Sequence, residues 1–152
     1  MVVEVLSNAS LKDIRKVFNQ LPLASEQYRS GFFQASFIGP WWLRLSAKPS
    51  ISLSGLSGWL GKKFINSNTA TNILKNKSGL IEKFQMSCQT GNSLVDGKTC
   101  IYLDYGKTAP IPWRWIKDEM RVLDDQTLLC MTIIDLPLLR KFSFPFLLRR
   151  EL

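Results

Sequence analysis

The densest cluster of charged and aromatic residues in this chain is the segment Trp113-Arg-Trp-Ile-Lys-Asp-Glu-Met-Arg121. If the segment is a strand, its side chains alternate between the two faces of a sheet. The side chains that share a face with Asp118 are then mainly apolar: Ile116, Met120 and Val122. We therefore expect Asp118, rather than Glu119, to point into the interior, where a carboxylate needs a partner or a raised pKa.

An interior Asp118 has three interpretations, which the sequence leaves open. It is the polar anchor of a ligand pocket, together with Tyr102 or Asn72, because apolar cavities usually carry a few convergent polar groups. Alternatively, it belongs to an internal ion pair that fixes the register of the strands. In the third interpretation, Asp118 and Tyr102 are the acid and base of an isomerase or cyclase that acts on an apolar substrate.

Several other kinds of chemistry lack their residues. The chain has no histidine and no Cys-x-x-Cys pair, which transition-metal sites normally use. The serine-rich stretch 50–57 contains no G-x-S-x-G motif, and Gly55, Gly58 and Gly61 are not followed by Lys-Ser/Thr. We expect no metal, no cofactor and no nucleotide hydrolysis, and we favour non-catalytic binding over catalysis.

The elements that position these residues begin with an amphipathic helix over residues 10–21. Ser10 supplies an N-cap hydroxyl, Asp13 follows three residues later, and Pro22 ends the helix. Its apolar residues recur on one face: Leu11, Ile14, Val17, Phe18 and Leu21. We expect this stripe to pack against the domain, with a partner surface as the alternative.

The remainder of the chain is rich in short strand-like segments. Alternating or aromatic runs cover residues 31–38, 59–65, 69–75, 80–89, 99–105, 113–123, 128–134 and 145–152. Residues 41–47 form either a helical turn or a plug, residues 50–58 a loop, and residues 137–142 a short helix before the last strand. Turns are expected at Asp96-Gly97 and Asp124-Asp125.

Short strands joined by tight turns, without long crossover helices, are typical of an antiparallel meander. An open sheet of this size would leave two unpaired edges, and closure into a barrel removes both. We therefore predict a mainly β fold in a single domain, residues 1–152, with the helix at about 10–21 and a closed antiparallel barrel at about 29–152.

Four short stretches carry a family resemblance over roughly residues 50–152. They are Leu56-Ser-Gly-Trp-Leu-Gly-Lys-Lys-Phe64, Asp96-Gly97, Asp104-Tyr105 and Ile116-Lys-Asp-Glu-Met-Arg121. In this order they resemble uncharacterised bacterial lipocalin-like proteins of the GXWXG type and, more distantly, the calycin barrels. Ser57 replaces the first glycine of the motif.

The resemblance implies binding of an apolar or amphipathic, fatty-acid-like molecule in the barrel interior. It also implies that Trp59 closes one end of the barrel and that Arg149 or Arg150 stacks across it. The candidate residues for lining or closing the pocket are Trp59, Phe84, Met86, Tyr102, Trp115, Asp118 and Met131.

The net charge of +8 allows anionic partners. Residues 1–90 contain 11 Lys and Arg against 4 Asp and Glu, whereas residues 91–152 contain 9 against 8. Peripheral association with an anionic membrane through this basic half and an exposed Trp41-Trp42 pair is a second hypothesis. We do not expect nucleic-acid binding, because the tryptophans of a small β core mostly supply buried area.

The expected location is the cytoplasm. The N-terminal sequence has neither a basic region followed by a long apolar stretch nor an Arg-rich transit pattern, and no apolar run is long enough to span a bilayer. Cys88, Cys100 and Cys130 are an odd set in apolar alternating runs, which predicts free buried thiols. The oligomeric state and the identity of the ligand are left open.

Overall fold

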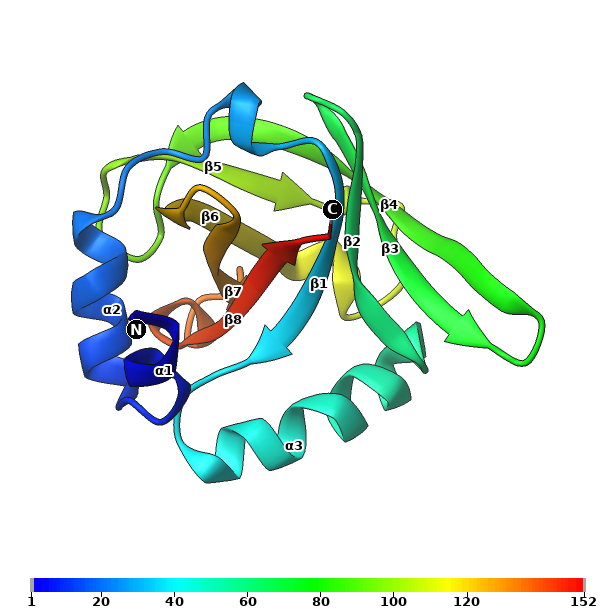
Figure 1. The fold of residues 1–152 in the computed structure, drawn as a ribbon, viewed down its shortest axis with the longest axis horizontal. Helices are drawn as coiled ribbons and strands as arrows, with labels where there is room; N and C mark the ends of the chain where they lie inside the picture. The colour runs from blue at the N-terminus through cyan, green and yellow to red at the C-terminus, as the bar shows by residue number, and fades with distance from the viewer. Residues whose placement is uncertain (1, 152) are drawn as a thin grey trace.

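The computed structural model describes residues 2–151, in which eight antiparallel strands follow one another around a closed barrel (Figure 1). β1 pairs with both β2 and β8, so neither edge of the sheet is left open. The strands are β1 (Gly31–Phe37), β2 (Trp59–Asn66), β3 (Thr69–Asn76), β4 (Gly79–Asn92), β5 (Thr99–Asp104), β6 (Ile116–Asp124), β7 (Thr127–Ile134) and β8 (Ser143–Arg150). The predicted closed meander is confirmed; Met1 and Leu152, included in the expected domain, lie outside the described residues.

Two predicted helical elements are also confirmed. The N-terminal one is α2 (Leu11–Gln20), where the Ser10 hydroxyl accepts a hydrogen bond from the backbone N–H of Asp13 at 3.1 Å. The short one before the last strand is the single turn η4 (Leu139–Lys141). The other helical elements are α1 (Val2–Ser7), η1 (Glu26–Tyr28), α3 (Trp41–Ile51), η2 (Ser52–Leu56) and η3 (Trp113–Trp115).

α1 and α2 cover the outer surface of β7 and β8 (Figure 1). One apolar cluster joins the helices to these strands: Leu6, Ile14, Phe18, Ile38, Leu129, Met131 and Leu147. The stripe of α2 therefore packs against the domain, as expected. This cover explains why β7 is apolar on both of its faces, since one face lines the barrel and the other lies beneath the helices.

The outer face of β6 carries two buried charged side chains, Arg121 and Glu119. The Arg121 guanidinium donates to both Asp96 carboxylate oxygens, at 2.6 and 2.9 Å, and to the Phe18 carbonyl at 2.8 Å. Glu119 is buried beside it, where it accepts from the Ser93 hydroxyl at 3.0 Å and the Leu94 N–H at 2.8 Å. The β4–β5 loop thus covers the face that Asp118 does not use.

Two segments differ from the prediction. Residues 113–115, expected to begin a strand, form the turn η3, because Pro110 and Pro112 have no N–H for a ladder. Residues 50–56, expected to be a loop, extend α3 through η2. Their serines are accommodated because the Ser50 and Ser54 hydroxyls donate to carbonyls four residues earlier, at 2.7 and 2.8 Å.

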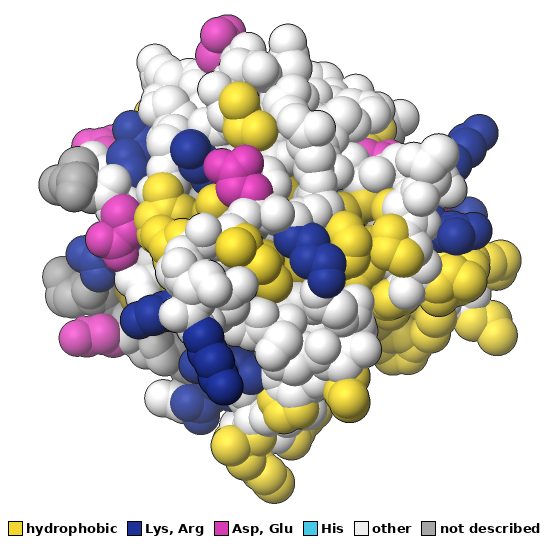
Figure 2. Space-filling model, turned by 90° about the vertical axis from the view of Figure 1, so that its right-hand side faces the viewer, with side chains coloured by type: hydrophobic (Ala, Val, Ile, Leu, Met, Phe, Trp, Pro, Cys, Tyr) yellow, Lys and Arg dark blue, Asp and Glu magenta, His cyan; other side chains and the backbone are white. Residues whose placement is uncertain are grey.

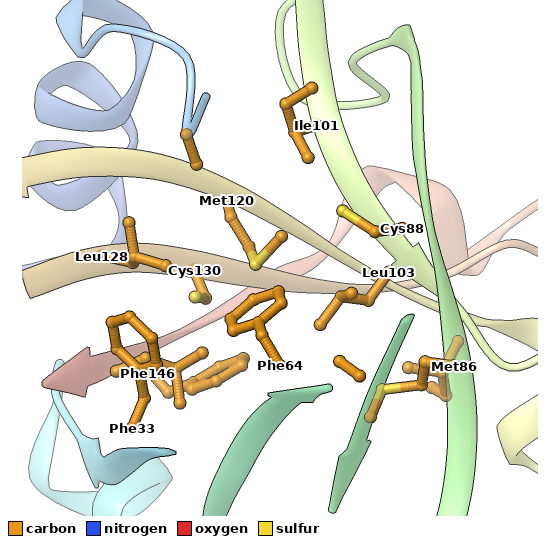
Figure 3. Close-up of a cluster of buried hydrophobic side chains, with 14 of the residues drawn as sticks. Phe33, Phe64, Met86, Cys88, Ile101, Leu103, Met120, Leu128, Cys130 and Phe146 are labelled. Atoms are coloured by element: carbon orange, nitrogen blue, oxygen red, sulfur yellow. The ribbon is translucent and has the colours of Figure 1, made fainter. Parts of the chain in front are cut away.

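The barrel interior has two different halves. Figure 3 shows the filled half, where apolar side chains from strands all around the barrel converge: Phe33, Phe64, Met86, Cys88, Ile101, Leu103, Met120, Leu128 and Cys130. Phe146, labelled in the same view, also borders the space in the other half. α3 runs across the other end of the barrel (Figure 1). The connection between β1 and β2 thus becomes a helical cover over one barrel mouth.

The three cysteines are free and buried, which confirms the thiol prediction. They contribute to packing rather than to cross-links. Among residues 2–151, none of the helices combines the length and the apolar character needed to cross a bilayer.

The ion pair of Arg121 and Asp96 predicts that part of the folding stability is lost in acid. Hydrogen bonding from the Arg121 side chain is the main reason that the pKa of Asp96 is lowered, despite the opposing effect of burial. Because the folded-state pKa lies below the unfolded value of about 3.9, the stabilisation is complete above that value and is lost as the pH falls through the folded pKa. Asp96→Asn should lose about 3 kcal/mol near neutral pH and show a flatter stability profile in acid, measured by urea unfolding.

Asp125→Asn is the matched control, because Asp125 is exposed in the β6–β7 turn. Its profile should run parallel to that of the unsubstituted protein. Equal acid sensitivity in the Asp96→Asn protein would contradict the assignment.

Candidate functional site

A cavity of about 410 Å³ lies between α3 and the open half of the barrel. α3 contributes apolar side chains that include Leu43, Ala47 and Ile51, on successive turns of the same helix face. The ends of the strands contribute the facing wall, with Phe37, Ile116, Ile134 and Phe144 among the lining residues. The site is therefore an apolar space between a helix and a sheet, and not a filled core.

Five polar side chains form a layer across the barrel at the inner end of this cavity: Lys62, Asn72, Tyr105, Asp118 and Thr132. The order of residues along β6 places this layer, since Ile116 lines the cavity, Asp118 comes next on that face, and Met120 lies in the filled half. Strand register aligns the layer, because Lys62 is opposite Asn72 and Asp118 is opposite Thr132. The layer separates the hollow half from the filled one.

Lys62 and Asp118 form a fully buried ion pair, with 3.0 Å between Nζ and Oδ2. The Lys62 ammonium also donates to the Tyr105 hydroxyl at 3.0 Å and to Asn72 Oδ1 at 3.1 Å. These contacts use the three protons of an ammonium group. Thr132 donates to the second carboxylate oxygen of Asp118 at 2.7 Å, so the pair is satisfied without any added group.

The electrostatics of the layer keep Lys62 charged. Burial by itself disfavours the ammonium, but the Asp118 carboxylate and the Tyr105 oxygen outweigh this effect, so the pKa of Lys62 is raised. Burial is the main reason that the pKa of Tyr105 is raised, which keeps its hydroxyl protonated. Lys62 is therefore an ammonium that balances Asp118, and not a neutral amine available as a nucleophile.

Trp59 stands at the side of the cavity and joins the polar layer. Its indole N–H donates to Asn72 Oδ1 at 3.0 Å, and its ring meets Phe146 edge to face at 5.8 Å. Gly58 and Gly61 allow this placement, because a Cβ would lie 2.2 Å from the Lys75 carbonyl oxygen at the first and 2.0 Å from that of Phe33 at the second. Close backbone packing thus accounts for both glycines of the partial motif.

The expected stacking of Arg149 or Arg150 on Trp59 is wrong. β8 runs away from the cavity, from Phe144 at its wall towards the filled half, so its last residues lie at the opposite end of the barrel from Trp59. Arg150 instead lies over the Phe33 ring at 5.3 Å, and Arg149 is exposed. The cation beside Trp59 is Lys62, at 5.7 Å from the ring centroid.

The structure brings some of the predicted residues together and separates others. Trp59 and Asp118 line the cavity, and Asn72, weighed as a partner of Asp118, lies beside them. Met86 adjoins the layer from below, with its sulfur 3.3 Å from Lys62 Nζ. Phe84 lies next to the lining residue Trp113, with 6.0 Å between the centroids of the two rings.

Met86 and Phe84 are outside the set that lines the cavity, and so are the three other predicted residues. Tyr102 is on the outer face of β5, where its hydroxyl donates to Gln89. Met131 is on the outer face of β7, buried beneath α1 and α2. Trp115 ends the turn η3 and is half-buried.

Lys62 and Tyr105 are the functional-site residues that sequence reasoning missed. The adjacent Lys62 and Lys63 suggest a pair of surface lysines. In an alternating strand, however, Lys62 is on the same face as Phe64, and this could have predicted an inward Lys62. A β-bulge between Trp59 and Gly61 then puts Trp59 beside Lys62, which strict alternation separates. Tyr105 shares a face with Ile101 and Leu103, so alternation pointed to it rather than to Tyr102.

No protein-family model and no curated protein matches this sequence. A solved structure of a protein from Thermomonospora curvata is similar to the chain, with a TM-score of 0.70 and 12% sequence identity. The match covers 99% of this chain and 95% of that chain. At this identity the likeness shows a shared fold alone, and it supports the barrel together with its helical additions.

The buried ion pair predicts a large difference between two adjacent lysines. Lys62→Met leaves the Asp118 carboxylate buried without its cation and should destabilise the protein by about 3–5 kcal/mol in urea unfolding. Lys63→Met is the matched control, because Lys63 is about half exposed and faces Glu82 at 3.5 Å on the surface. It should cost less than about 1 kcal/mol.

A double variant separates charge from packing. Lys62→Met with Asp118→Leu removes both charges and should recover most of the stability lost in Lys62→Met. A double variant that loses the sum of both single effects would show that the two side chains do not act as a pair.

Proposed function

We propose that this protein binds an apolar or amphipathic small molecule, of a fatty-acid-like kind, in the cavity beneath α3. The observation that carries the proposal is the hollow half of the barrel: about 410 Å³ lined mainly by aliphatic and aromatic side chains. This volume lies within the range of roughly 300–1,000 Å³ typical of small-molecule sites. The lipocalin-like resemblance of the sequence supports the same function.

The polar layer sets the orientation of the ligand in this proposal. The Lys62 ammonium and both oxygens of Asp118 already have partners, so a charged group at the inner end would have to break the ion pair. An apolar chain breaks no ion pair or hydrogen bond there, because the layer has no net charge and its polar groups already have partners. The ligand therefore places its apolar part inside and keeps any charged head group towards α3.

The same geometry favours binding over catalysis. Acid–base chemistry needs a group that can exchange its proton with a substrate. Asp118 is held by Lys62 and Thr132, and Lys62 is held as an ammonium. We propose a binding protein of the cytoplasm, a location that the free buried thiols suit because that compartment is reducing.

Uptake of a fluorescent fatty-acid probe tests this proposal. The purified protein should bind the probe saturably, and Ala47→Trp should weaken binding at least about tenfold, because a new indole ring occupies the space. Lys48→Trp is the matched control, since it puts the same side chain on the exposed side of the same helix and should bind as before. Absence of saturable uptake, or equal loss in both variants, would contradict the proposal.

Competition between a fatty acid and its methyl ester tests the orientation. With the head group kept away from the ion pair, the two should displace the probe with affinities within tenfold, which is 1.4 kcal/mol. A much tighter acid would mean that its carboxylate reaches Lys62. Native mass spectrometry of the protein as purified provides an independent check for a retained apolar molecule.

A further inference from the structure

Large apolar side chains are exposed around the cavity end of the molecule. On α3 and η2, Trp41 is 66% exposed, Leu45 70% and Leu53 91%. In the segment that leads to β8, Leu138 is 78% exposed and Phe142 56%. We call these five residues the apolar rim. Figure 2 shows hydrophobic side chains gathered over the lower part of the molecule, the level at which α3 lies in Figure 1.

The cavity ties the two parts of the rim to one end of the barrel. Trp42, the neighbour of Trp41, lines the cavity together with seven other residues of α3 and η2. Ile134 and Phe144, which flank the segment that carries Leu138 and Phe142, line it as well. Both rim segments therefore border the same space, and the rim surrounds the site proposed for the ligand.

The charges in these segments have one sign. Residues 41–56 contain Arg44 and Lys48 and no acidic residue, and residues 136–150 contain only basic charges, among them Arg140 and Lys141. Asp135, the acidic residue nearest to Leu138 in sequence, accepts from Arg140 at 2.5 Å and pairs with Lys117 at 3.2 Å. The rim is thus apolar side chains interspersed with cations.

We propose that this end of the barrel docks on an anionic lipid bilayer, with the apolar rim in the interfacial region and Arg44, Lys48, Arg140 and Lys141 against the head groups. Exposed tryptophan and leucine side chains among lysines and arginines are what an interfacial contact requires. Each basic residue near an anionic surface adds to the attraction. Two copies of this face would bring like charges together, which opposes self-association through it.

Docking in this orientation places the ligand cavity against the bilayer. An apolar ligand then passes between the membrane and the barrel without crossing bulk water, where its transfer is costly. This consequence rests on the proposed function, whereas docking itself does not.

Flotation with lipid vesicles tests the docking. The full chain should float with phosphatidylcholine vesicles that contain phosphatidylserine and remain unbound with phosphatidylcholine alone. Raised salt should weaken the binding, because it screens the attraction between cations and head groups.

Two double variants locate the contact. Leu45→Ser with Lys48→Glu, both exposed on α3, should lower vesicle binding at least about tenfold without changing the unfolding midpoint. Ile65→Ser with Lys63→Glu makes matching changes at exposed residues next to the β2–β3 turn, at the filled end of the barrel, and should bind like the unsubstituted chain.

Failure of the chain to float, or equal loss in both double variants, overturns the proposal. A dimer that the α3 variant abolishes, with no flotation, overturns it in favour of a second copy, and size-exclusion chromatography reads this outcome. Probe uptake measured without vesicles distinguishes the two proposals. Flotation without probe uptake would reject the proposed ligand binding and keep the proposed docking. Probe uptake without flotation would reject the docking and keep the ligand binding.

Discussion

The buried ion pair of Lys62 and Asp118 is the interaction around which the barrel interior is organised. Two charges removed from water are tolerated only when each has its partners, and here Tyr105, Asn72 and Thr132 complete the set. Four of these residues come from four strands, β2, β3, β6 and β7, and Tyr105 directly follows β5. A slip of one residue in any pairing would turn a member of the layer to the outside, so the ion pair and the strand register depend on each other.

The layer also explains why one half of the barrel is filled and the other hollow. Below it, aromatic and aliphatic side chains from facing strands meet and exclude water (Figure 3). Above it, inward side chains such as Ile116 and Ile134 line a space that they do not fill, and α3 closes it. The apolar rim and its cations lie on the segments that frame this hollow half. Cavity, cover and proposed docking surface are thus parts of the same end of the molecule.

Alternation of apolar and polar residues predicted most of the strands, and the two unpaired edges of an open sheet predicted their closure. Alternation also turned Asp118 inward, since its face on β6 is apolar. Alternation could not distinguish the inner from the outer face of a strand where both faces are buried. Because α1 and α2 cover β7, Met131 on its outer face is as apolar as a cavity-lining residue but lies beneath the helices. Cys100, which is buried on the face of Tyr102, hides the inward direction of β5 in the same way. Placing Lys62 beside Trp59 required knowledge of a bulge. Predicting α3 and η2 required knowing that Pro49 and four serines are compatible with helical structure in this setting.

The division of the barrel has a consequence for how this protein can change through evolution. Side chains of the filled half are packed on all sides, so each substitution there leaves a gap or a clash. Side chains of α3 that face the hollow half border empty space. A change in their size alters the shape of the cavity and changes the folding stability little. Descendants of this chain can therefore change the size and shape of the cavity by drift in the β1–β2 connection while the filled half is conserved.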